Sequence, residues 1–453
     1  MGKETEQKQE IVNQGVHTYS QEEAYVWPEE PVLREQLEWF QDQKLALMVH
    51  WGVYNQLGMV ASWALSDEDA EWSRKTMDWT DDGEVFKRQY RALNRAFDPV
   101  AFQPEEWAKM AKKCGFRYLI LTTKHHDGFC LWDTAYTEYK TTAEECPFHT
   151  HKYADIVRAM FDAFRKEGLG IGAYFSKADW HCPDYWEKEK VFTGKTTRNP
   201  TYDPKENPEA WERFRAFTRD QILELGKQYG RLDILWFDAG WVAAANGQDI
   251  RLGEIVEEVR KTQPWVLAVD RTVGGAYENY VTPEMCVPWE SCLTLGADFN
   301  YAYGDHYKSP RELVNLLVNI VAKGGNLALN ISPQPDGRIP VEAWESLREL
   351  GVWMQMYGEA IYGTRICAPY RSGNLAFTRK GDVVYVIRLY PEEKEAVEEK
   401  LLIPYQGKIR GISMVDTKKE AEWKMTEEGI QVVIPQEYRE GETPIAIVWK
   451  IEQ

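Results

Sequence analysis

The sequence predicts a (β/α)8-like barrel of the TIM-barrel class, followed by a C-terminal β-sandwich. Short apolar runs, which suit parallel strands buried on both faces, alternate with helical patterns over about 300 residues. After residue 358 this rhythm gives way to brief β-rich segments that are divided by Gly, Pro and acidic turns. A chain of 453 residues is long enough for both domains.

Six apolar runs are predicted as strands, with helical patterns between them. Pro104 begins one helical pattern, and Gly115, Gly168 and Gly230 follow the ends of three of them. Because a closed barrel needs eight strands, a doubly wound open sheet stays open as the alternative. No G-x-G-x-x-G follows the first strand, which disfavours a dinucleotide site. The predicted strands are 45–50, 118–124, 169–175, 232–238, 265–270 and 326–331, and the helices between them are 104–115, 154–168, 208–230, 250–263 and 309–325.

Three regions follow from these patterns. Residues 1–34 are polar and irregular and are predicted as an N-terminal lead-in, residues 35–362 as the barrel domain and residues 363–453 as the sandwich. The last helix of the barrel domain is expected over 341–358. Beyond it we expect strands without intervening helices in the segments "DVVYVIRLY", "KLLIPY", "IRGISMVD", "AEWKMTEEG", "IQVVIP" and "TPIAIVWKIE".

The charge balance limits the kinds of partner. With 54 basic and 72 acidic residues the formal net charge is −18, so we expect neither a nucleic acid nor an anionic membrane as partner. The seven cysteines lack the C-x-x-C spacing of zinc sites, and the charged N-terminus lacks the apolar core of a signal peptide. These features predict a soluble, cytoplasmic protein with reduced thiols and a neutral ligand. The sequence leaves open whether it forms a homo-oligomer.

Polar and titratable residues stand where the predicted strands end. In a βα-barrel the carboxyl ends of the strands meet at one rim, and the chemistry gathers there. Such a rim would form a pocket for a polar ligand. The residues at these ends are His50, the run Lys124, His125, His126 and Asp127, then Tyr174, Asp238, Asp270 and Arg271.

Each of these residues also has an ordinary structural interpretation. Asp238 could cap the next helix, and His50 could be a hydrogen-bonded structural histidine. Adjacent residues of a strand point to opposite faces, so we do not expect His125 and His126 to bind one metal ion, and no metal cofactor is predicted. A metal-dependent hydrolase that uses both histidines and Asp127 remains a further hypothesis.

Five motifs together resemble one known family. "HWGVY" (50–54), "LTTKHHDGFCLW" (121–132), "LWFDAGW" (235–241), "DR" (270–271) and "GGNLALNISPQPDG" (324–337) follow one another in the order seen in glycoside hydrolase family 29, the α-L-fucosidases. The resemblance covers about residues 36–362, and the β-rich tail is similar to the C-terminal sandwich of that family. It implies an exo-acting, retaining hydrolase that removes terminal α-L-fucose from oligosaccharides or glycoconjugates without a cofactor.

The resemblance also assigns roles to residues. It implies that Asp238 is the nucleophile that forms a glycosyl-enzyme ester. Where members often have Tyr-Tyr-Ser, this chain has Tyr174-Phe175-Ser176, which keeps the first aromatic residue. The residues that the resemblance implies to contact fucose are His50, Glu71, Trp72, His125, His126, Tyr174 and Arg271.

The general acid/base is not fixed by the sequence. Glu284 in "TPE" resembles the T-x-E of some bacterial members, and Glu290 in "PWE" resembles the Trp-Glu of others. We prefer Glu284, and Glu71 and Glu278 are further candidates. Two alternative functions stay open, a retaining hydrolase of a related sugar such as an α-L-galactoside and a non-catalytic carbohydrate-binding protein.

The side of the pocket that holds the aglycone is expected to come from variable loops. We expect it in residues 55–90, 183–205 and 241–250, so the sequence does not predict which linkage is cleaved. Trp211, Trp241 or Tyr202 could line it, although core packing is the commoner role of a single aromatic residue.

Overall fold

The computed structural model describes residues 27–74, 79–270, 277–278 and 288–453. Its largest sheet has eight strands in the order β5-β4-β3-β2-β1-β8-β7-β6, and every neighbouring pair is parallel. The strands are β1 Leu45–Val49, β2 Tyr118–Lys124, β3 Gly170–Ser176, β4 Ile234–Asp238, β5 Leu267–Asp270, β6 Tyr277–Glu278, β7 Trp289–Thr294 and β8 Asn326–Ile331.

This strand order decides between the two predicted sheet types. Strand β1 pairs with both β2 and β8, so the first and last strands of the series are neighbours. The order is therefore cyclic, as in a (β/α)8 barrel, whereas a doubly wound sheet reverses its order at a switch point. The prediction of a (β/α)8-like barrel is confirmed, and that of an open doubly wound sheet is wrong.

Two strands of the barrel, β6 and β7, were not predicted from the sequence. Strand β6 has only two residues, Tyr277–Glu278. Strand β7 reads WESCLT, and its Glu290 and Ser291 are buried although they are polar. A pattern of apolar runs does not detect a strand that buries polar side chains, because burial is then supported by hydrogen bonds rather than by apolar surface.

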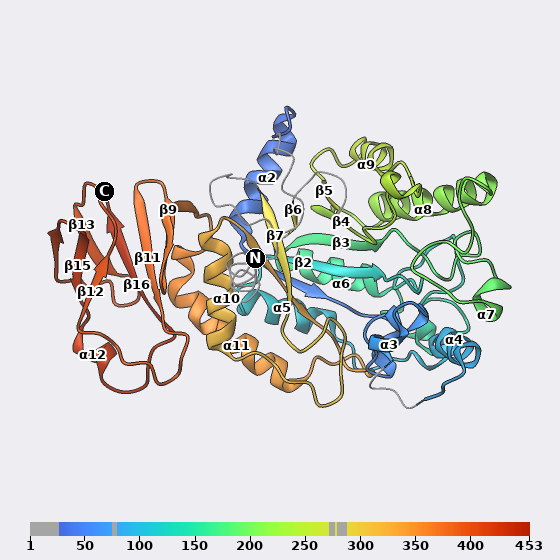
Figure 1. The fold of residues 1–453 in the computed structure, drawn as a ribbon, viewed down its shortest axis with the longest axis horizontal. Helices are drawn as coiled ribbons and strands as arrows, with labels where there is room; N and C mark the ends of the chain where they lie inside the picture. The colour runs from blue at the N-terminus through green and yellow to red at the C-terminus, as the bar shows by residue number, and fades with distance from the viewer. Residues whose placement is uncertain (1–26, 75–78, 271–276, 279–287) are drawn as a thin grey trace, which may run out of the picture.

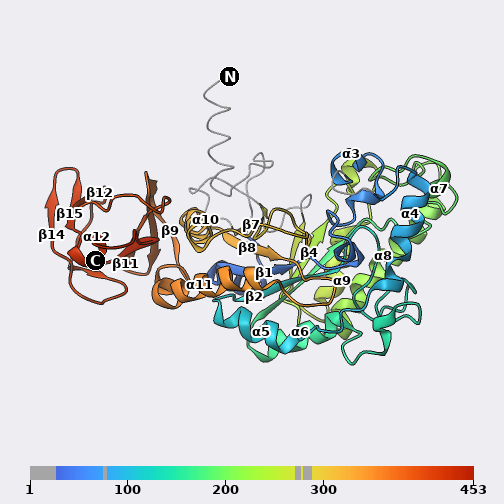
Figure 2. The same ribbon diagram turned by 90° about the horizontal axis from the view of Figure 1, so that it is seen from below.

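The helices that were predicted in the barrel domain begin within two residues of their expected starts. Gly115, Gly168 and Gly230, which follow three of them, have φ angles of 92°, 77° and 72°, a left-handed conformation that favours glycine and ends a helix. Figure 2 shows α5 and α6 beside each other outside the sheet. The longer helices are α2 Pro31–Gln43, α4 Gly83–Arg91, α5 Pro104–Lys113, α6 Ile156–Lys166, α8 Pro208–Gln228, α9 Leu252–Arg260, α10 Pro310–Ala322 and α11 Val341–Tyr357, and the short ones are α3 Ala70–Ser73, α7 Lys190–Thr193 and α12 Gln436–Arg439.

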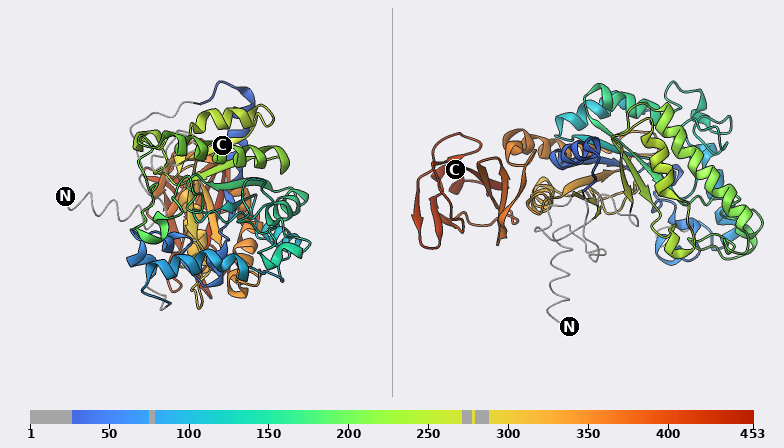
Figure 3. Two further views of the ribbon diagram at one scale, coloured as in Figure 1. Left: turned by 90° about the vertical axis from the view of Figure 1, so that its right-hand side faces the viewer. Right: turned by 90° about the horizontal axis from the view of Figure 1, so that it is seen from above.

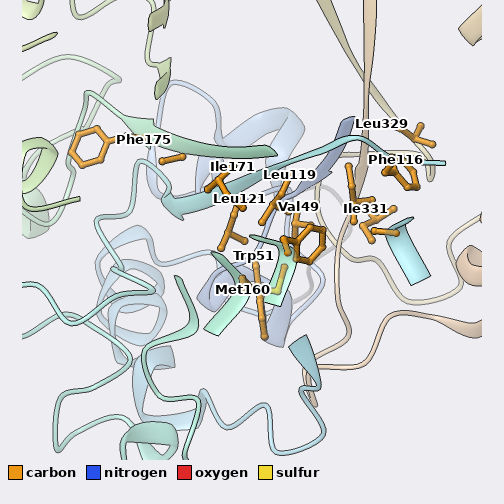
Figure 4. Packing of buried hydrophobic residues seen from close by; sticks show 14 of the residues in the cluster. Val49, Trp51, Phe116, Leu119, Leu121, Met160, Ile171, Phe175, Leu329 and Ile331 are labelled. Atoms are coloured by element: carbon orange, nitrogen blue, oxygen red, sulfur yellow. The ribbon is translucent and has the colours of Figure 1, made fainter. Parts of the chain in front are cut away.

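The strands bury both of their faces. In β1, Leu47 and Val49 belong to a large cluster that also contains helix residues, whereas Ala46 and Met48 belong to a smaller cluster inside the barrel. This alternation follows from the two-residue period of a strand. Figure 4 shows part of the outer cluster, which includes Val49 of β1 and Met160 of α6.

Helix α2 lies across the N-terminal ends of the barrel strands. The Phe40 ring lies 6.0 Å from the ring of Tyr118, the first residue of β2, and the Asn326 amide of β8 donates to the Phe40 carbonyl at 2.7 Å. The Gln36 side chain donates to Asp233, directly before β4, at 3.2 Å. This end of the barrel is therefore covered by α2, which begins within the predicted lead-in.

Residues beyond the barrel form two antiparallel sheets that share a core. The five-stranded sheet has the order β13-β16-β11-β10-β9 and the three-stranded sheet the order β12-β15-β14. Val386 and Trp449 of the larger sheet and Ile403 and Ile430 of the smaller one belong to one hydrophobic cluster, as in a β-sandwich. The strands are β9 Arg365–Ser372, β10 Leu375–Lys380, β11 Val383–Leu389, β12 Lys400–Ile403, β13 Gly411–Met414, β14 Trp423–Thr426, β15 Gly429–Val433 and β16 Ala446–Glu452.

Two details of the sandwich differ from the prediction. Strands β9 and β10 were not predicted, and the short helix α12 lies where no helix was expected. Figure 1 shows the sandwich at the left and α3, α4 and α7 at the right, beyond the carboxyl end of β2. That right-hand end faces the viewer in the left view of Figure 3. Among the described residues, no helix has the length and apolar character needed to cross a membrane.

Candidate active site

Asp238 is the last residue of β4 and lies at the mouth of the barrel. Its carboxylate accepts a hydrogen bond from the Tyr174 hydroxyl, and its Oδ2 atom is 3.9 Å from His126 Nε2. The side chain keeps 11% of its surface exposed. The next residue, Ala239, has a φ of 65°, so the chain turns sharply away from the strand. The N-cap position of α9 belongs to Arg251, so the cap hypothesis for Asp238 is wrong.

His125 and His126 lie beside this carboxylate and His50 packs on Tyr174, and a hydrogen bond orients each of the three rings. His50 Nδ1 is 2.7 Å from Asn330 Oδ1, and His126 Nδ1 is 2.7 Å from Ser176 Oγ. His125 Nδ1 bonds with Ser62 Oγ. The rings are packed edge to face or tilted, with 5.8 Å between the centroids of His50 and His125. A hydrogen bond at one ring nitrogen fixes the orientation in which the other nitrogen is presented.

The expectation that His125 and His126 point to opposite faces is wrong. Strand β2 ends at Lys124, so both histidines lie in the following turn, where strand alternation does not apply. Their ring centroids are 4.0 Å apart. Nitrogen atoms of the two rings and an oxygen of Asp238 all lie within 4.8 Å of one another, a spacing that could hold a metal ion.

Asp127, the third ligand of the metal hypothesis, does not belong to that group. Its carboxylate accepts hydrogen bonds from the Tyr90 hydroxyl at 2.8 Å and from the Phe129 backbone amide at 3.1 Å. Burial raises the pKa of Asp127 to about 7. Asp127 is thus bonded in the protein interior, and a metal-dependent hydrolase built on all three residues of the "HHD" run is not supported.

The Tyr174 ring is held between two other rings inside the mouth. His125 stacks on it with 5.9 Å between centroids and 5° between planes, and Trp236 with 5.3 Å and 14°. The His50 ring meets it edge-on at 5.3 Å. Stacking restrains the ring, so the hydroxyl stays directed at Asp238.

A buried ion pair that the sequence analysis did not anticipate lies beside the nucleophile candidate. Lys177, the first residue after β3, places its Nζ 2.7 and 2.9 Å from the two carboxylate oxygens of Asp270 at the end of β5. The Lys177 backbone amide donates to the Asp238 carbonyl at 3.2 Å. Lys177 therefore joins the ends of β3, β4 and β5. The signal in the sequence is a lysine directly after an apolar strand.

Glu290, a candidate acid/base, lies inside the barrel. Its carboxylate accepts hydrogen bonds from the Tyr118 hydroxyl and, at 3.1 Å, from Trp236 Nε1, and the residue is 1% exposed. Tyr118 begins β2, and Trp236 precedes Asp238 by two positions on β4. Because these donors belong to layers nearer the covered end, the Glu290 carboxylate is directed away from the mouth.

Other predicted site residues are placed only in part. Arg271 and Glu284 lie outside the described residues, and of Glu278 only the backbone of β6 is described. Glu71 and Trp72 lie on the short helix α3, where Glu71 is exposed and Trp72 is 44% exposed. The structure thus brings the three histidines, Tyr174 and Asp238 together, and Glu71 and Trp72 lie on α3 in the segment that follows β1.

Comparisons with known proteins identify the family of this chain. Residues 12–359 match the family described as Alpha-L-fucosidase. The chain is 30% identical over 382 residues to plasma alpha-L-fucosidase of Rattus norvegicus, with 82% of this chain and 78% of that protein covered. It is 25% identical over 430 residues to tissue alpha-L-fucosidase of Homo sapiens, with 91% and 88% covered.

Solved structures show the same likeness over the whole fold. Alpha-L-fucosidase isoenzyme 1 from Paenibacillus thiaminolyticus superimposes with a TM-score of 0.75 at 28% identity, covering 93% of this chain and 99% of that chain. The alpha-fucosidase of Thermotoga maritima in complex with fucose gives 0.73 at 28% identity, covering 94% and 100%. The chain therefore belongs to the α-L-fucosidase family of glycoside hydrolases, family 29.

Proposed function

We propose that this protein is an exo-acting, retaining α-L-fucosidase that releases terminal α-L-fucose from oligosaccharides or glycoconjugates, with Asp238 as its nucleophile. The observation that carries the proposal is the position of Asp238 at the barrel mouth, bonded to Tyr174 and close to the oriented rings of His125 and His126. Family membership and the fucose-bound relative support fucose as the sugar.

The proposed reaction has two displacements at the anomeric carbon. In the first, a carboxylate oxygen of Asp238 bonds to C1, the bond from C1 to the aglycone oxygen breaks, and a glutamic acid donates its proton to that oxygen. In the second, the glutamate removes a proton from water, the water oxygen bonds to C1, and the ester to Asp238 breaks. The sugar leaves with its original anomeric configuration.

Glu284 is the proposed acid/base of this reaction. An acid/base must reach the aglycone oxygen from the mouth, about 5 Å from the nucleophile in a retaining enzyme. The Glu290 carboxylate is engaged by Tyr118 and Trp236 in the barrel interior, which argues against it. Glu284, which the sequence already favoured, then remains our preferred candidate.

The fucose hydroxyls are proposed to bind His50, His125, His126 and Arg271. Imidazole nitrogens and a guanidinium can donate to hydroxyl groups, and the orienting bonds to Asn330 and Ser176 reduce the entropy lost on binding. Tyr174 is proposed to orient the nucleophile rather than to transfer protons.

The proposal can be tested by trapping the intermediate. A 2-fluoro fucosyl donor forms a slowly hydrolysed ester, and digestion followed by mass spectrometry should locate the label on Asp238. The variant Asp238→Asn should lose at least about a thousandfold in kcat on an aryl α-L-fucoside. Retention of more than about a tenth of the activity would exclude Asp238 as nucleophile. An aryl α-L-galactoside measured in parallel shows whether fucose is the preferred sugar.

A further inference from the structure

A row of tryptophan rings leads from the candidate active site to the protein surface. Trp180 and His126 are fully buried, Trp63 and Trp241 are half-buried, and Trp72 is 44% exposed. The centroids of Trp63 and Trp241 lie 4.9 and 5.0 Å from that of His126, and 5.7 Å from each other. Because His126 lies 3.9 Å from Asp238, the two half-buried rings adjoin the reacting centre.

These rings come from separate connections at the mouth. Trp63 follows β1 in the chain, and Trp241 lies three residues after Asp238, beyond the sharp turn at Ala239. Trp63 and Trp241 both stand steeply to the His126 ring, with interplanar angles of 73° and 68°. Two segments far apart in the sequence thus present indole rings on the same side of His126.

Neighbouring polar residues hold Trp63 and Trp241 in place. Trp241 Nε1 donates to the Tyr185 hydroxyl at 3.0 Å, so its polar edge is engaged by the protein. Arg198 lies over the Trp63 ring at 5.0 Å and donates to both oxygens of Asp69 at 2.5 and 3.1 Å. With the Trp241 edge bonded, its apolar face is the part left for a ligand to contact.

Asp69 and Arg198, which lie beside Trp63, form an ion pair. Burial alone would raise the pKa of Asp69, but hydrogen bonds from Arg198, Ser66 and Trp72 outweigh it and lower the pKa, so Asp69 is ionised opposite the Arg198 guanidinium. Such a surface combines flat apolar faces with a compensated ion pair. It suits a neutral molecule that has both C–H faces and hydroxyl groups, as a pyranose does.

We propose that Trp63 and Trp241 form the binding subsite for the neutral sugar to which the fucose is attached. The inference rests on the proposed function, because it takes Asp238 as the point of cleavage. An exo-acting enzyme must hold the leaving sugar between the nucleophile and solvent, which is the interval that these two rings occupy. Both rings keep part of their surface exposed, whereas Trp180 beside them is fully buried. Trp72, matched by resemblance to a fucose contact, is not part of the subsite.

The test compares a substrate with an aglycone sugar to one without. For Trp241→Leu and Trp63→Leu, kcat/KM is measured on α-L-fucosyl fluoride and on the fucosyl disaccharide that the unaltered enzyme cleaves best among the α1,2, α1,3, α1,4 and α1,6 isomers. We expect the disaccharide-to-fluoride ratio of kcat/KM to fall at least about tenfold in each variant. Trp241→Phe, which keeps an aromatic face, should restore most of that ratio.

Trp265→Leu is the matched control. Trp265 is half-buried, its Nε1 donates to a backbone carbonyl at 3.0 Å, and Arg231 lies over its ring at 4.4 Å, but it precedes β5 at the opposite end of the barrel. Its variant should leave the substrate ratio as it is.

The outcomes separate this inference from the proposed function. Equal losses on both substrates in Trp241→Leu and Trp63→Leu would mean that the rings only support the fold, and would overturn the subsite. An unchanged disaccharide-to-fluoride ratio of kcat/KM would also overturn the subsite, and so would an unaltered enzyme that hydrolyses the fluoride but none of the disaccharides. In each of these cases the proposed fucosidase activity stands. Turnover of neither substrate by the unaltered enzyme would overturn the proposed function together with the subsite.

Discussion

The mouth and the interior of the barrel each hold a buried carboxylate that accepts a hydrogen bond from a tyrosine hydroxyl. At the mouth, Asp238 pairs with Tyr174, and in the interior Glu290 pairs with Tyr118. The two differ in their other neighbours, because His126 stands beside Asp238 while Trp236 completes the bonding of Glu290. Burial and hydrogen bonding alone therefore do not identify a catalytic carboxylate. Access to a ligand does.

Among the variants that test this difference between the mouth and the interior, Glu284→Ala is expected to lower kcat most. Loss of general acid/base catalysis should lower kcat by about a hundredfold to ten thousandfold on a substrate with a poor leaving group. On an aryl α-L-fucoside with a good leaving group, which departs without a proton donor, added azide should restore turnover and yield a fucosyl azide, because a small anion can attack the ester without base catalysis. Glu278→Ala, which removes another candidate glutamate between β5 and β7, serves as control. A Glu284→Ala variant that keeps more than about a tenth of the activity would contradict the assignment.

A smaller loss is expected for Tyr174→Phe. It removes one hydrogen bond to a charged group, worth about 1.5–3 kcal/mol, so kcat/KM should fall roughly tenfold to a hundredfold. The control is Tyr153→Phe, since Tyr153 donates to Glu105 at 2.8 Å on the protein surface. If the loss at Tyr174 were no larger than at Tyr153, the bond to Asp238 would have no role in turnover.

Glu290→Gln should disturb the fold more than the reaction. The amide group turns a donor toward Trp236 or Tyr118, which leaves buried polar groups poorly matched and should lower the free energy of unfolding by about 1–3 kcal/mol. We expect kcat to fall less than tenfold, as measured beside urea unfolding curves. Azide rescue of a Glu290→Ala variant would break the comparison, because rescue would show that this carboxylate serves the reaction.

The smallest effect on turnover is expected for Asp127→Asn, which acts on stability. The folded pKa of about 7 lies above the ordinary value of 3.8, so the folded chain binds the proton more tightly than the unfolded chain. The contribution of Asp127 to stability is thus full below about pH 4 and declines as the pH rises to 7. Between pH 5 and pH 8 the free energy of unfolding of the unaltered protein should fall by about 2–3 kcal/mol more than that of the variant. The free energy of unfolding is measured with urea at both pH values. If it fell equally in the unaltered protein and in the variant, the raised pKa of Asp127 would be contradicted.

The sequence predicted the strands whose residues are apolar on both faces, and it missed the strand and the ion pair that bury polar side chains. Strands β1 to β5 and β8 were found because both of their faces are apolar, and the barrel order then brought their ends together. Strand β7 was missed because Glu290 is supported by donors from two other strands, which no local pattern can reveal. The same holds for Lys177, whose partner Asp270 is 93 residues away. The histidine geometry was mispredicted because the end of β2 falls one residue before His125.

The position of α2 has a consequence for the order of events in the proposed reaction. In the part of the chain that the structure describes, Leu37 and Phe40 pack into the inner cluster, so we expect substrate, water and both products to use the mouth as their route. The severed glycan must then depart before the attacking water can arrive, and fucose leaves last. A concentrated alcohol could take the place of that water, so the same geometry predicts transfer of fucose to acceptors.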